Sequence, residues 1–235
     1  YSSGRLNLKN NDVHIWRTDL NLETERVEEA RKILSIDEQK RAERYKFEKH
    51  KNSFIVARST LRKILSSYLN IEPGRLEFDY SDRGKPSLSK TDLKNNLQFN
   101  LSHSQELALY SFTNERKVGI DLEYCRAMPD AENIAKRFFS SNEYKWISSF
   151  TNDAQQEAFF RCWTAKEAYL KATGEGIAGS LELIEIDFTR TGLFKLKESN
   201  REISNWLLYN FIPELNYMAT VAVENQAIDL SYWQF

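Results

Sequence analysis

The chain is poor in cysteine and histidine. Its 235 residues include two cysteines, Cys125 and Cys162, and three histidines. The cysteines form neither a CxxC pair nor a Cys/His cluster with metal-ligand spacing, so the sequence excludes a disulfide framework and a structural zinc site. We interpret both cysteines as reduced thiols, which indicates a cytoplasmic protein.

An excess of one sign of charge and long apolar runs are also missing. Lys and Arg number 33 and Asp and Glu 34, a formal net charge of -1. The chain is therefore no polycation that would hold nucleic acid or an anionic membrane. No apolar run approaches the roughly 20 residues that a membrane-spanning helix needs. The sequence thus favours partners other than nucleic acid and membrane, and any basic site must be local.

Hydrophobic periodicity predicts an α+β fold with an internal repeat. The order strand, helix, long amphipathic helix and further strands occurs twice, with the break near residues 113–117. We therefore predict two similar halves, 1–115 and 116–235, in one compact body, although such an order also arises by chance. The predicted elements are strands at 13–16, 76–80, 97–101, 107–112, 118–122, 183–188, 206–211 and 217–223, helices at 23–34, 54–69, 131–139 and 157–173, and a capped helix start at Ser35.

Two carboxylates share one side of the apolar segment Val118–Glu123. Strand geometry points Asp121 and Glu123 to the same face. Adjacent like charges raise each other's pKa and cost stability, so the pair makes sense if a cation lies between them. Oxygen ligands at this spacing suit Mg²⁺, which is typically held by one or two carboxylates together with phosphate oxygens and water. The alternative is a solvated strand edge, which this segment alone does not exclude.

Another pair of charged residues lies on the predicted helix 157–173. Glu167 and Lys171 are four residues apart and so lie on one face of the helix. As an exposed ion pair they would contribute only about 0.3–0.5 kcal/mol, and such pairs are common. Apolar neighbours such as Phe160 and Trp163 predict instead that the helix is anchored in the core and holds both charges rigidly at its rim.

The segment Asn100–Ser104 is predicted to be a polar bend between two strands. Its hydroxyl and imidazole, from Ser102 and His103, can bind a phosphate oxygen, although a single histidine is more often structural. Ser102, His103 and Asp121 are also the residue types of a hydrolytic triad. The GxSxG elbow is missing, however, and no spacing supports a triad.

Two basic segments are weaker candidates for phosphate binding. In the turn Asp82–Pro86, glycine permits close backbone approach and Lys85 supplies a positive charge. The stretch Lys40–Lys51 is rich in Lys and Arg, and Arg58 follows on the next helix. Generic turns and solvated charged faces have the same composition, so these segments carry weight only together with the others.

Four of these segments together resemble the 4′-phosphopantetheinyl transferase superfamily, in its double-length, surfactin-synthetase-activating type. The family's V/I-G-I/V-D-x-E strand matches Val118–Glu123, and its W-S/T-x-K-E-A-x-x-K helix matches Trp163–Lys171. Its G-K-P turn and N-I/L-S-H-S bend match Gly84–Pro86 and Asn100–Ser104. Because the four motifs occur in order over residues 84–171, the resemblance is specific.

The resemblance implies a fold, a reaction and a set of site residues. The fold is α+β, two similar α/β halves related by a pseudo-twofold axis, with coenzyme A in the cleft between them. The reaction moves 4′-phosphopantetheine from coenzyme A to a serine of an acyl or peptidyl carrier protein and releases 3′,5′-ADP. The implied residues are Asp121, Glu123 and Glu167 for Mg²⁺ (or Mn²⁺), Asp121, Glu167 and Lys171 for catalysis, and Arg41, Arg58, Lys85, Ser102, His103, Lys166 and Lys171 for coenzyme A. Where some relatives have two lysines, this chain has Glu38 and Arg41.

Such a reaction depends on positioning and electrostatics. We expect Lys171 and Lys166 to neutralise charge on the departing 3′,5′-ADP, and Glu167, or a metal-bound water next to Glu123, to accept the serine proton. An acidic helical carrier protein is expected to dock near residues 124–137. A duplicated chain supplies its own cleft, so we expect a monomer.

Two other classes of protein remain open. A coenzyme A or nucleotide-binding module without transferase activity would keep Lys85 and His103 but would need no three carboxylates. A metal-dependent phosphohydrolase would need more carboxylates or histidines, to hold two metals.

Overall fold

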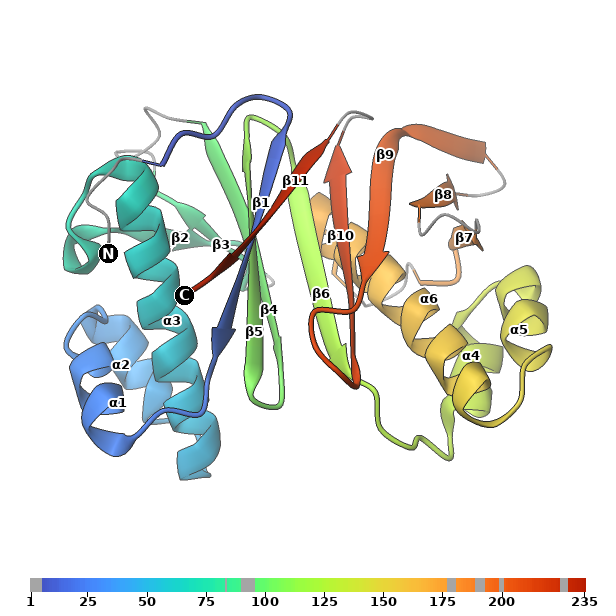
Figure 1. The fold of residues 1–235 in the computed structure, drawn as a ribbon, viewed down its shortest axis with the longest axis horizontal. Helices are drawn as coiled ribbons and strands as arrows, with labels where there is room; N and C mark the ends of the chain where they lie inside the picture. Colours follow the sequence, from blue (N-terminus) through green and yellow to red (C-terminus); the bar gives the residue numbers. More distant parts are fainter. Residues whose placement is uncertain are drawn as a thin grey trace.

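Two β-sheets lie between two groups of helices in the computed structural model of the chain, which describes residues 6–82, 84–89, 96–176, 181–188, 193–198, 201–224 and 228–235 (Figure 1). The first part of the chain forms β1 (Asp12–Asp19), α1 (Thr24–Arg31), α2 (Ile36–Ala42), α3 (Glu48–Leu69), a 3-10 turn (Pro73–Arg75), β2 (Phe78–Tyr80), β3 (Pro86–Leu88), β4 (Leu97–Ser104) and β5 (Leu107–Asn114). The second part forms β6 (Val118–Tyr124), α4 (Ala131–Phe138), α5 (Ser141–Ser148), α6 (Asn152–Thr173), β7 (Ile184–Phe188), β8 (Leu193–Glu198), β9 (Arg201–Phe211), β10 (Tyr217–Glu224) and β11 (Asp229–Gln234).

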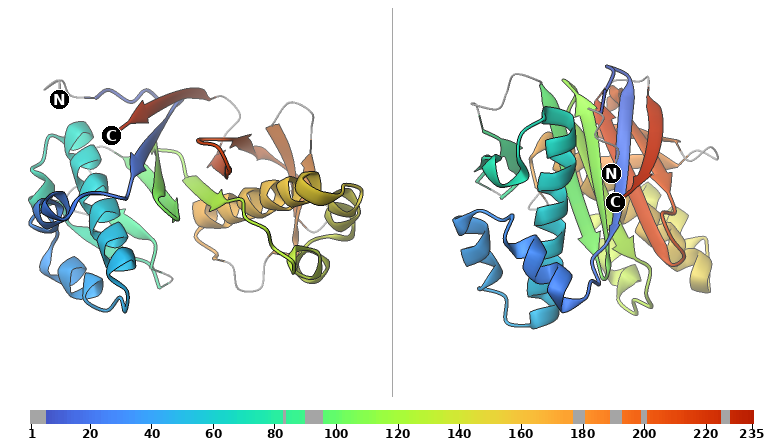
Figure 2. Two further views of the ribbon diagram at one scale, coloured as in Figure 1. Left: turned by 60° about the horizontal axis from the view of Figure 1, so that its bottom comes forward. Right: turned by 60° about the vertical axis from the view of Figure 1, so that its left-hand side comes forward.

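The layers run helix, sheet, sheet, helix. The first sheet has the strand order β11-β1-β5-β4 and the second β6-β10-β9-β8-β7, while β2 and β3 form a separate hairpin. Helices α1–α3 cover the outer side of the first sheet and α4–α6 that of the second (Figures 1 and 2). Apolar side chains of β1, β5, β6 and β10, such as Ile15, Leu109, Ile120 and Val221, form a core between the two sheets. The two halves therefore share one buried interface.

The halves repeat the same local construction. Ser35 and Glu38 form a capping box at the start of α2, and Ser140 and Glu143 form one at the start of α5. The following helices, α3 and α6, each have 22 residues and end at a left-handed C-cap residue, Asn70 or Gly174. The predicted fold class, two similar α/β halves, is thus confirmed.

The last strand crosses back to the first sheet. β11 pairs in parallel with β1, from Asp12 opposite Asp229 to Arg17 opposite Gln234. The first sheet therefore contains a strand from the end of the chain, and a division at residue 115 does not separate the two sheets completely. The bounds 1–115 and 116–235 stay a prediction for the domains.

The sheets meet where β4 lies beside β6. Three alternate side chains of β4 accept hydrogen bonds from alternate backbone N–H groups of β6: Asn100 from Ile120 at 2.9 Å, Ser102 from Leu122 at 3.3 Å and Ser104 from Tyr124 at 3.1 Å. The expected polar bend at residues 100–104 is therefore wrong, because these residues form the end of β4 and the turn follows at Gln105, which has φ 51°. The polar side chains of Asn100, Ser102 and Ser104 therefore join the two halves.

Two observations bear on the setting of the protein. Cys125 and Cys162 are free thiols, and Cys162 is buried. Among the residues that the structure describes, no helix combines the length and the apolar character needed to cross a membrane.

Candidate active site

The carboxylates of the candidate site come from β6 and α6. Asp121 in β6 and Glu167 in α6 are 3% and 4% exposed, and Glu123 is half-buried. Gly119 permits the close approach of the two elements, since a Cβ at this residue would lie 2.0 Å from the carbonyl oxygen of Ala168. The three predicted metal ligands line one cavity of about 380 Å³.

Lys171 and two serines of β4 hold the carboxylates of β6. Lys171 Nζ lies 2.6 Å from Asp121 Oδ1 and donates a hydrogen bond to Ser102 Oγ at 2.9 Å. Ser102 Oγ donates to Asp121 Oδ1 at 3.1 Å, and Ser104 Oγ donates to Glu123 Oε2 at 3.1 Å. Ser102, expected at a nucleotide phosphate, therefore faces Asp121 and Lys171. Ser102 and Ser104, which join β4 to β6, thus also orient the carboxylates of Asp121 and Glu123.

Burial and mutual repulsion raise the pKa of two of these carboxyls. Burial first and the charge of Asp121 second raise the pKa of Glu167 to about 7, although Lys171 opposes the shift. The same two causes raise the pKa of Glu123. In each case burial and the neighbouring carboxylate outweigh the opposing positive charge of Lys171.

The oxygen atoms of the acidic group fit a cation. Asp121 Oδ2 and Glu167 Oε1 are buried and make no hydrogen bond with any described residue. Buried carboxylate oxygens without partners are costly unless a cation or donor satisfies them. Within the described ranges, no three Asp, Glu, His or Cys side chains stand close enough to enclose a metal ion. The unpartnered carboxylate oxygens suit a hard cation in their chemistry, but the three carboxylates would have to move closer together to bind it.

A basic cavity adjoins the acidic one. It measures about 340 Å³, and five of the predicted coenzyme A residues line it: Arg41, Arg58, Lys85, His103 and Lys171. Leu101, His103 and Lys171 line both cavities. The structure therefore brings together side chains from both halves that are up to 130 residues apart along the chain. They form a hollow made of two cavities with shared lining residues, one basic and one acidic.

Lys85 lies against the end of α6. Its Nζ donates hydrogen bonds to the carbonyl oxygens of Lys171 at 2.5 Å and Ala172 at 3.4 Å. A cation is favourable here because the C-terminal end of a helix carries partial negative charge. Burial, and then the charge of Lys117, nevertheless lower the pKa of Lys85 to about 8. Gly84 before it has φ 79° and open space around its Cβ position, so it serves the turn rather than a close approach; Arg83 lies outside the described residues.

The structure does not bring Lys166 to this hollow, which corrects the prediction that it binds coenzyme A. Its side chain is fully buried, with Nζ 2.7 Å from Glu143 Oε2 and 2.7 Å from the carbonyl oxygen of Leu181. Successive residues of an α-helix point about 100° apart. Glu167 lines the acidic cavity, so its neighbour Lys166 points away from that cavity, toward Glu143 of α5.

Sequence reasoning gave no role to Glu38, Tyr80 or Ser104. Glu38 forms ion pairs with Arg58 and Arg62 inside the first half, and Tyr80 also contacts Arg58. The capping-box spacing from Ser35 to Glu38 was visible in the sequence, and it predicts only a helix start. Nothing in the sequence indicates that Glu38 would also meet two arginines.

Comparisons with known proteins identify the family of the chain. A family model described as the 4′-phosphopantetheinyl transferase superfamily matches residues 117–222, and one described as 4′-phosphopantetheinyl transferase, N-terminal, matches residues 20–113. The chain is 44% identical over 230 residues to the 4′-phosphopantetheinyl transferase HetI of Nostoc sp., covering 98% of this chain and 95% of that protein. It is 34% identical to the 4′-phosphopantetheinyl transferase gsp of Aneurinibacillus migulanus, covering 60% of this chain and 56% of that protein. A solved holo-(acyl-carrier-protein) synthase from Bacillus anthracis, in complex with CoA (3′,5′-ADP), is 20% identical with a TM-score of 0.36, covering 47% of this chain and 96% of that one. The chain belongs to the 4′-phosphopantetheinyl transferase superfamily and is an enzyme of this class.

Proposed function

We propose that the chain transfers 4′-phosphopantetheine from coenzyme A to a serine of an acyl or peptidyl carrier protein at the junction of the basic and acidic cavities. The observation that carries this proposal is that Lys171 and His103 line both cavities. Arg41, Arg58 and Lys85 suit the phosphates of the nucleotide, because guanidinium and ammonium groups bind phosphate oxygens. The pyrophosphate would then lie at the junction, beside the carboxylates.

Asp121, Glu123 and Glu167 would hold Mg²⁺, or Mn²⁺, at the acidic end. Two buried oxygens without partners, Asp121 Oδ2 and Glu167 Oε1, support this placement. When bound, the ion supplies positive charge to the pyrophosphate. Lys171 contributes a second positive charge, and its Nζ contacts Asp121 Oδ1 at 2.6 Å.

The chain's own residues then account for the transfer. The serine oxygen forms a bond to the β-phosphorus, and the bond from that phosphorus to the bridging oxygen breaks, so 3′,5′-ADP leaves with the electron pair. Lys171 offsets the charge on the departing group. Glu167, whose carboxylate lines the acidic cavity beside Lys171, accepts the serine proton.

Intact-mass measurement tests the function. The purified chain is incubated with an apo carrier protein, coenzyme A and Mg²⁺, with and without EDTA. We expect the carrier to gain the mass of phosphopantetheine and the gain to disappear with EDTA. Unchanged mass across several acyl and peptidyl carriers, despite measured binding of coenzyme A, would favour a binding module without transferase activity.

The charge on Lys85 predicts a pH dependence of nucleotide binding. A lysine with a lowered pKa is charged below that pKa and loses its charge as the pH rises through it, here through about 8. Between pH 7 and pH 9, affinity for 3′,5′-ADP should therefore fall by about tenfold, because the protonated fraction falls by that factor. Calorimetric titration at several pH values checks this. Lys85→Met should bind weakly throughout, and an equal slope in wild type and variant would contradict the assignment.

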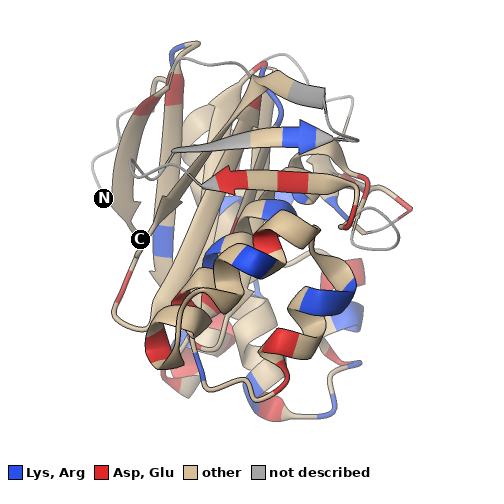
Figure 3. Ribbon diagram, turned by 90° about the vertical axis from the view of Figure 1, so that its right-hand side faces the viewer, with Lys and Arg blue, Asp and Glu red and all other residues tan. Residues whose placement is uncertain are grey.

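The carrier protein is proposed to dock beside Glu123, over residues 124–137. A hollow of about 200 Å³ there is lined by Tyr124, Arg126, Met128, Ile134 and Trp163, among others. Basic and acidic residues are interspersed along α4–α6 (Figure 3). A docking site for an acidic helical partner therefore needs a local set of basic groups rather than a basic face.

Charge reversal tests this placement. The triple variant Arg126→Glu, Lys136→Glu and Arg137→Glu should raise the KM for the carrier by about tenfold or more, with little change in the KM for coenzyme A. Lys32→Glu, an exposed change in the first half, is the control. An unchanged KM for the carrier in the triple variant would exclude these residues from the docking surface.

We further propose a monomer in a reducing cytoplasmic compartment. Both halves of the hollow come from one chain, and both cysteines are free. Sedimentation at micromolar concentration tests the assembly state.

A further inference from the structure

The first half contains a buried carboxylate between two arginines. Glu38 and Arg62 are both 1% exposed and Arg58 is 6% exposed. Glu38 Oε1 lies 3.0 Å from Arg58 Nε and 2.9 Å from Arg58 Nη2, while Glu38 Oε2 lies 2.7 Å from Arg62 Nε. Each carboxylate oxygen therefore serves a different guanidinium.

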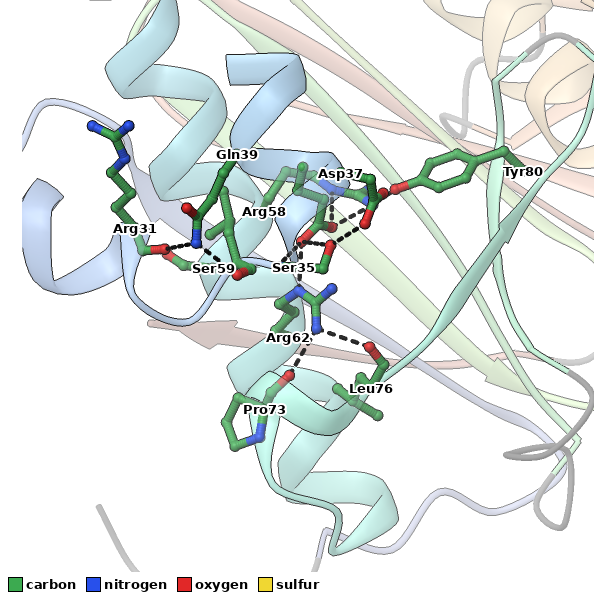
Figure 4. Close-up of polar contacts among 12 residues, drawn as sticks. Arg31, Ser35, Asp37, Gln39, Arg58, Ser59, Arg62, Pro73, Leu76 and Tyr80 are labelled. Atoms are coloured by element: carbon green, nitrogen blue, oxygen red, sulfur yellow. Dashed lines mark hydrogen bonds and ion pairs between the residues drawn. The ribbon is translucent and has the colours of Figure 1, made fainter. Parts of the chain in front are cut away.

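The two arginines have different surroundings. Arg62 Nη1 donates to the carbonyl oxygens of Pro73 and Leu76, both at 2.9 Å, so this residue ties α3 to the chain that follows it (Figure 4). Arg58 Nη2 instead meets the hydroxyl of Tyr80 at 2.5 Å, and Arg58 lines the basic cavity. Arg62 is thus a structural residue, whereas Arg58 is held by Glu38 and Tyr80 and lines the basic cavity.

The second half provides an internal comparison. Arg62 and Lys166 are each the fifteenth residue of their helices, α3 and α6, and each pairs with the capping-box glutamate of its own half. The eleventh residue, however, is Arg58 in α3 and the buried Cys162 in α6. The glutamate–cation pair is therefore common to both halves. The additional arginine is present only in the first half, which supplies Arg41, Arg58 and Lys85 to the basic cavity.

We infer that Glu38, together with Tyr80, is a positioning residue that fixes Arg58 toward the 3′-phosphate of the nucleotide and so sets the preference for coenzyme A over 3′-dephospho-coenzyme A. The inference rests on the proposed placement of the nucleotide in the basic cavity. Two nitrogens of Arg58 are engaged by Glu38 and Tyr80, which leaves Nη1 as the end of the guanidinium without a hydrogen bond to a described residue. Stacking of the guanidinium over the rings of Phe78 and Tyr80, at 5.0 and 5.6 Å, restricts it further. A guanidinium held in one orientation loses less freedom when it binds phosphate, and this favours the phosphorylated ligand.

Binding of 3′,5′-ADP and of 5′-AMP measures the preference directly, without turnover. For each variant, the dissociation constant of 5′-AMP is divided by that of 3′,5′-ADP, both from calorimetry. With an apo carrier protein, kcat/KM for coenzyme A is likewise divided by kcat/KM for its 3′-dephospho form, so both ratios are high when the 3′-phosphate is preferred. Glu38→Gln and Arg58→Ala should each lower both ratios by about tenfold or more. Tyr80→Phe, at a residue 37% exposed, should fold normally and lower them by a smaller factor in the same direction.

Glu143→Gln is the matched control, because it removes the equivalent buried charge in the second half. It should lower the Tm about as much as Glu38→Gln does and leave both ratios unchanged. If Arg58→Ala keeps the wild-type ratios, the nucleotide does not lie as proposed. If Arg58→Ala lowers them while Glu38→Gln and Tyr80→Phe do not, the placement stands and the positioning role fails. Higher ratios in Glu38→Gln would show that Glu38 only competes with the phosphate for Arg58, which also overturns the inference.

Discussion

Replacement of Glu167 by Gln is expected to abolish phosphopantetheine transfer. Gln keeps the size of the side chain, but it cannot accept the serine proton and offers no negative charge to a cation. A positioned general base contributes about 10²–10⁴-fold to a rate, so we expect a loss of at least that order in the mass-based assay. Binding of 3′,5′-ADP to the basic cavity should remain, because Glu167 does not line that cavity.

The same substitution should stabilise the metal-free protein. Burial and Asp121 raise the pKa of Glu167 in the folded chain from its usual 4.5 to about 7. Ionising this residue therefore costs stability above pH 4.5, and the cost grows until the pH passes 7. In EDTA at pH 8, the Tm of Glu167→Gln should exceed that of wild type by roughly 2–4 °C or more, and the difference should shrink as the pH falls toward 4.5.

Glu157→Gln is the control, since Glu157 lies on the same helix and is half-exposed in an ion pair with Arg161 at 2.8 Å. It should change neither transfer nor the pH dependence of the Tm. Near-normal transfer by Glu167→Gln would remove this residue from both of its proposed roles.

The long elements of the fold were predictable because each buries a continuous apolar stripe. The predicted ends of the two long helices, at residues 69 and 173, were correct, and each is followed by a left-handed residue, Asn70 or Gly174. Helix α5 was not predicted because it buries only Glu143 and Ile147, too few residues for a periodic pattern. Strand β11 was also missed, since most of its side chains are exposed and its pairing with β1 joins opposite ends of the chain.

The grouping of the three carboxylates in one cavity was predictable from local patterns in the sequence. Asp121 and Glu123 follow from strand alternation, and Glu167 from its place on a helix anchored in the core. The direction of Lys166 was not predictable, because a helix can be rotated about its axis without any change in its sequence motif. Its packing partner, Glu143, is more than 20 residues away along the chain and lies in an element that periodicity did not reveal.

Gly119→Ala is expected to disrupt the site. A Cβ at Gly119 would lie 2.0 Å from the carbonyl oxygen of Ala168 and 2.5 Å from the backbone nitrogen of Ala172, both in α6. Neither atom can move without the helix. Overpacking of a core typically costs about 1–3 kcal/mol, and relief of this clash would push α6 away from β6.

That displacement would separate Lys171 and Glu167 from Asp121, because the two elements carry opposite sides of the acidic cavity. A shift of about 1 Å in positioned groups can cost about 10²-fold in rate, so transfer should fall by at least that factor even in protein that remains folded by circular dichroism. Gly74→Ala provides the matched control, since the nearest atom to its new Cβ, the carbonyl oxygen of Ile33, is 3.9 Å away. Wild-type Tm and transfer rate in Gly119→Ala would mean that α6 and β6 have more room than the structure allows, and that the spacing of the carboxylates does not depend on this glycine.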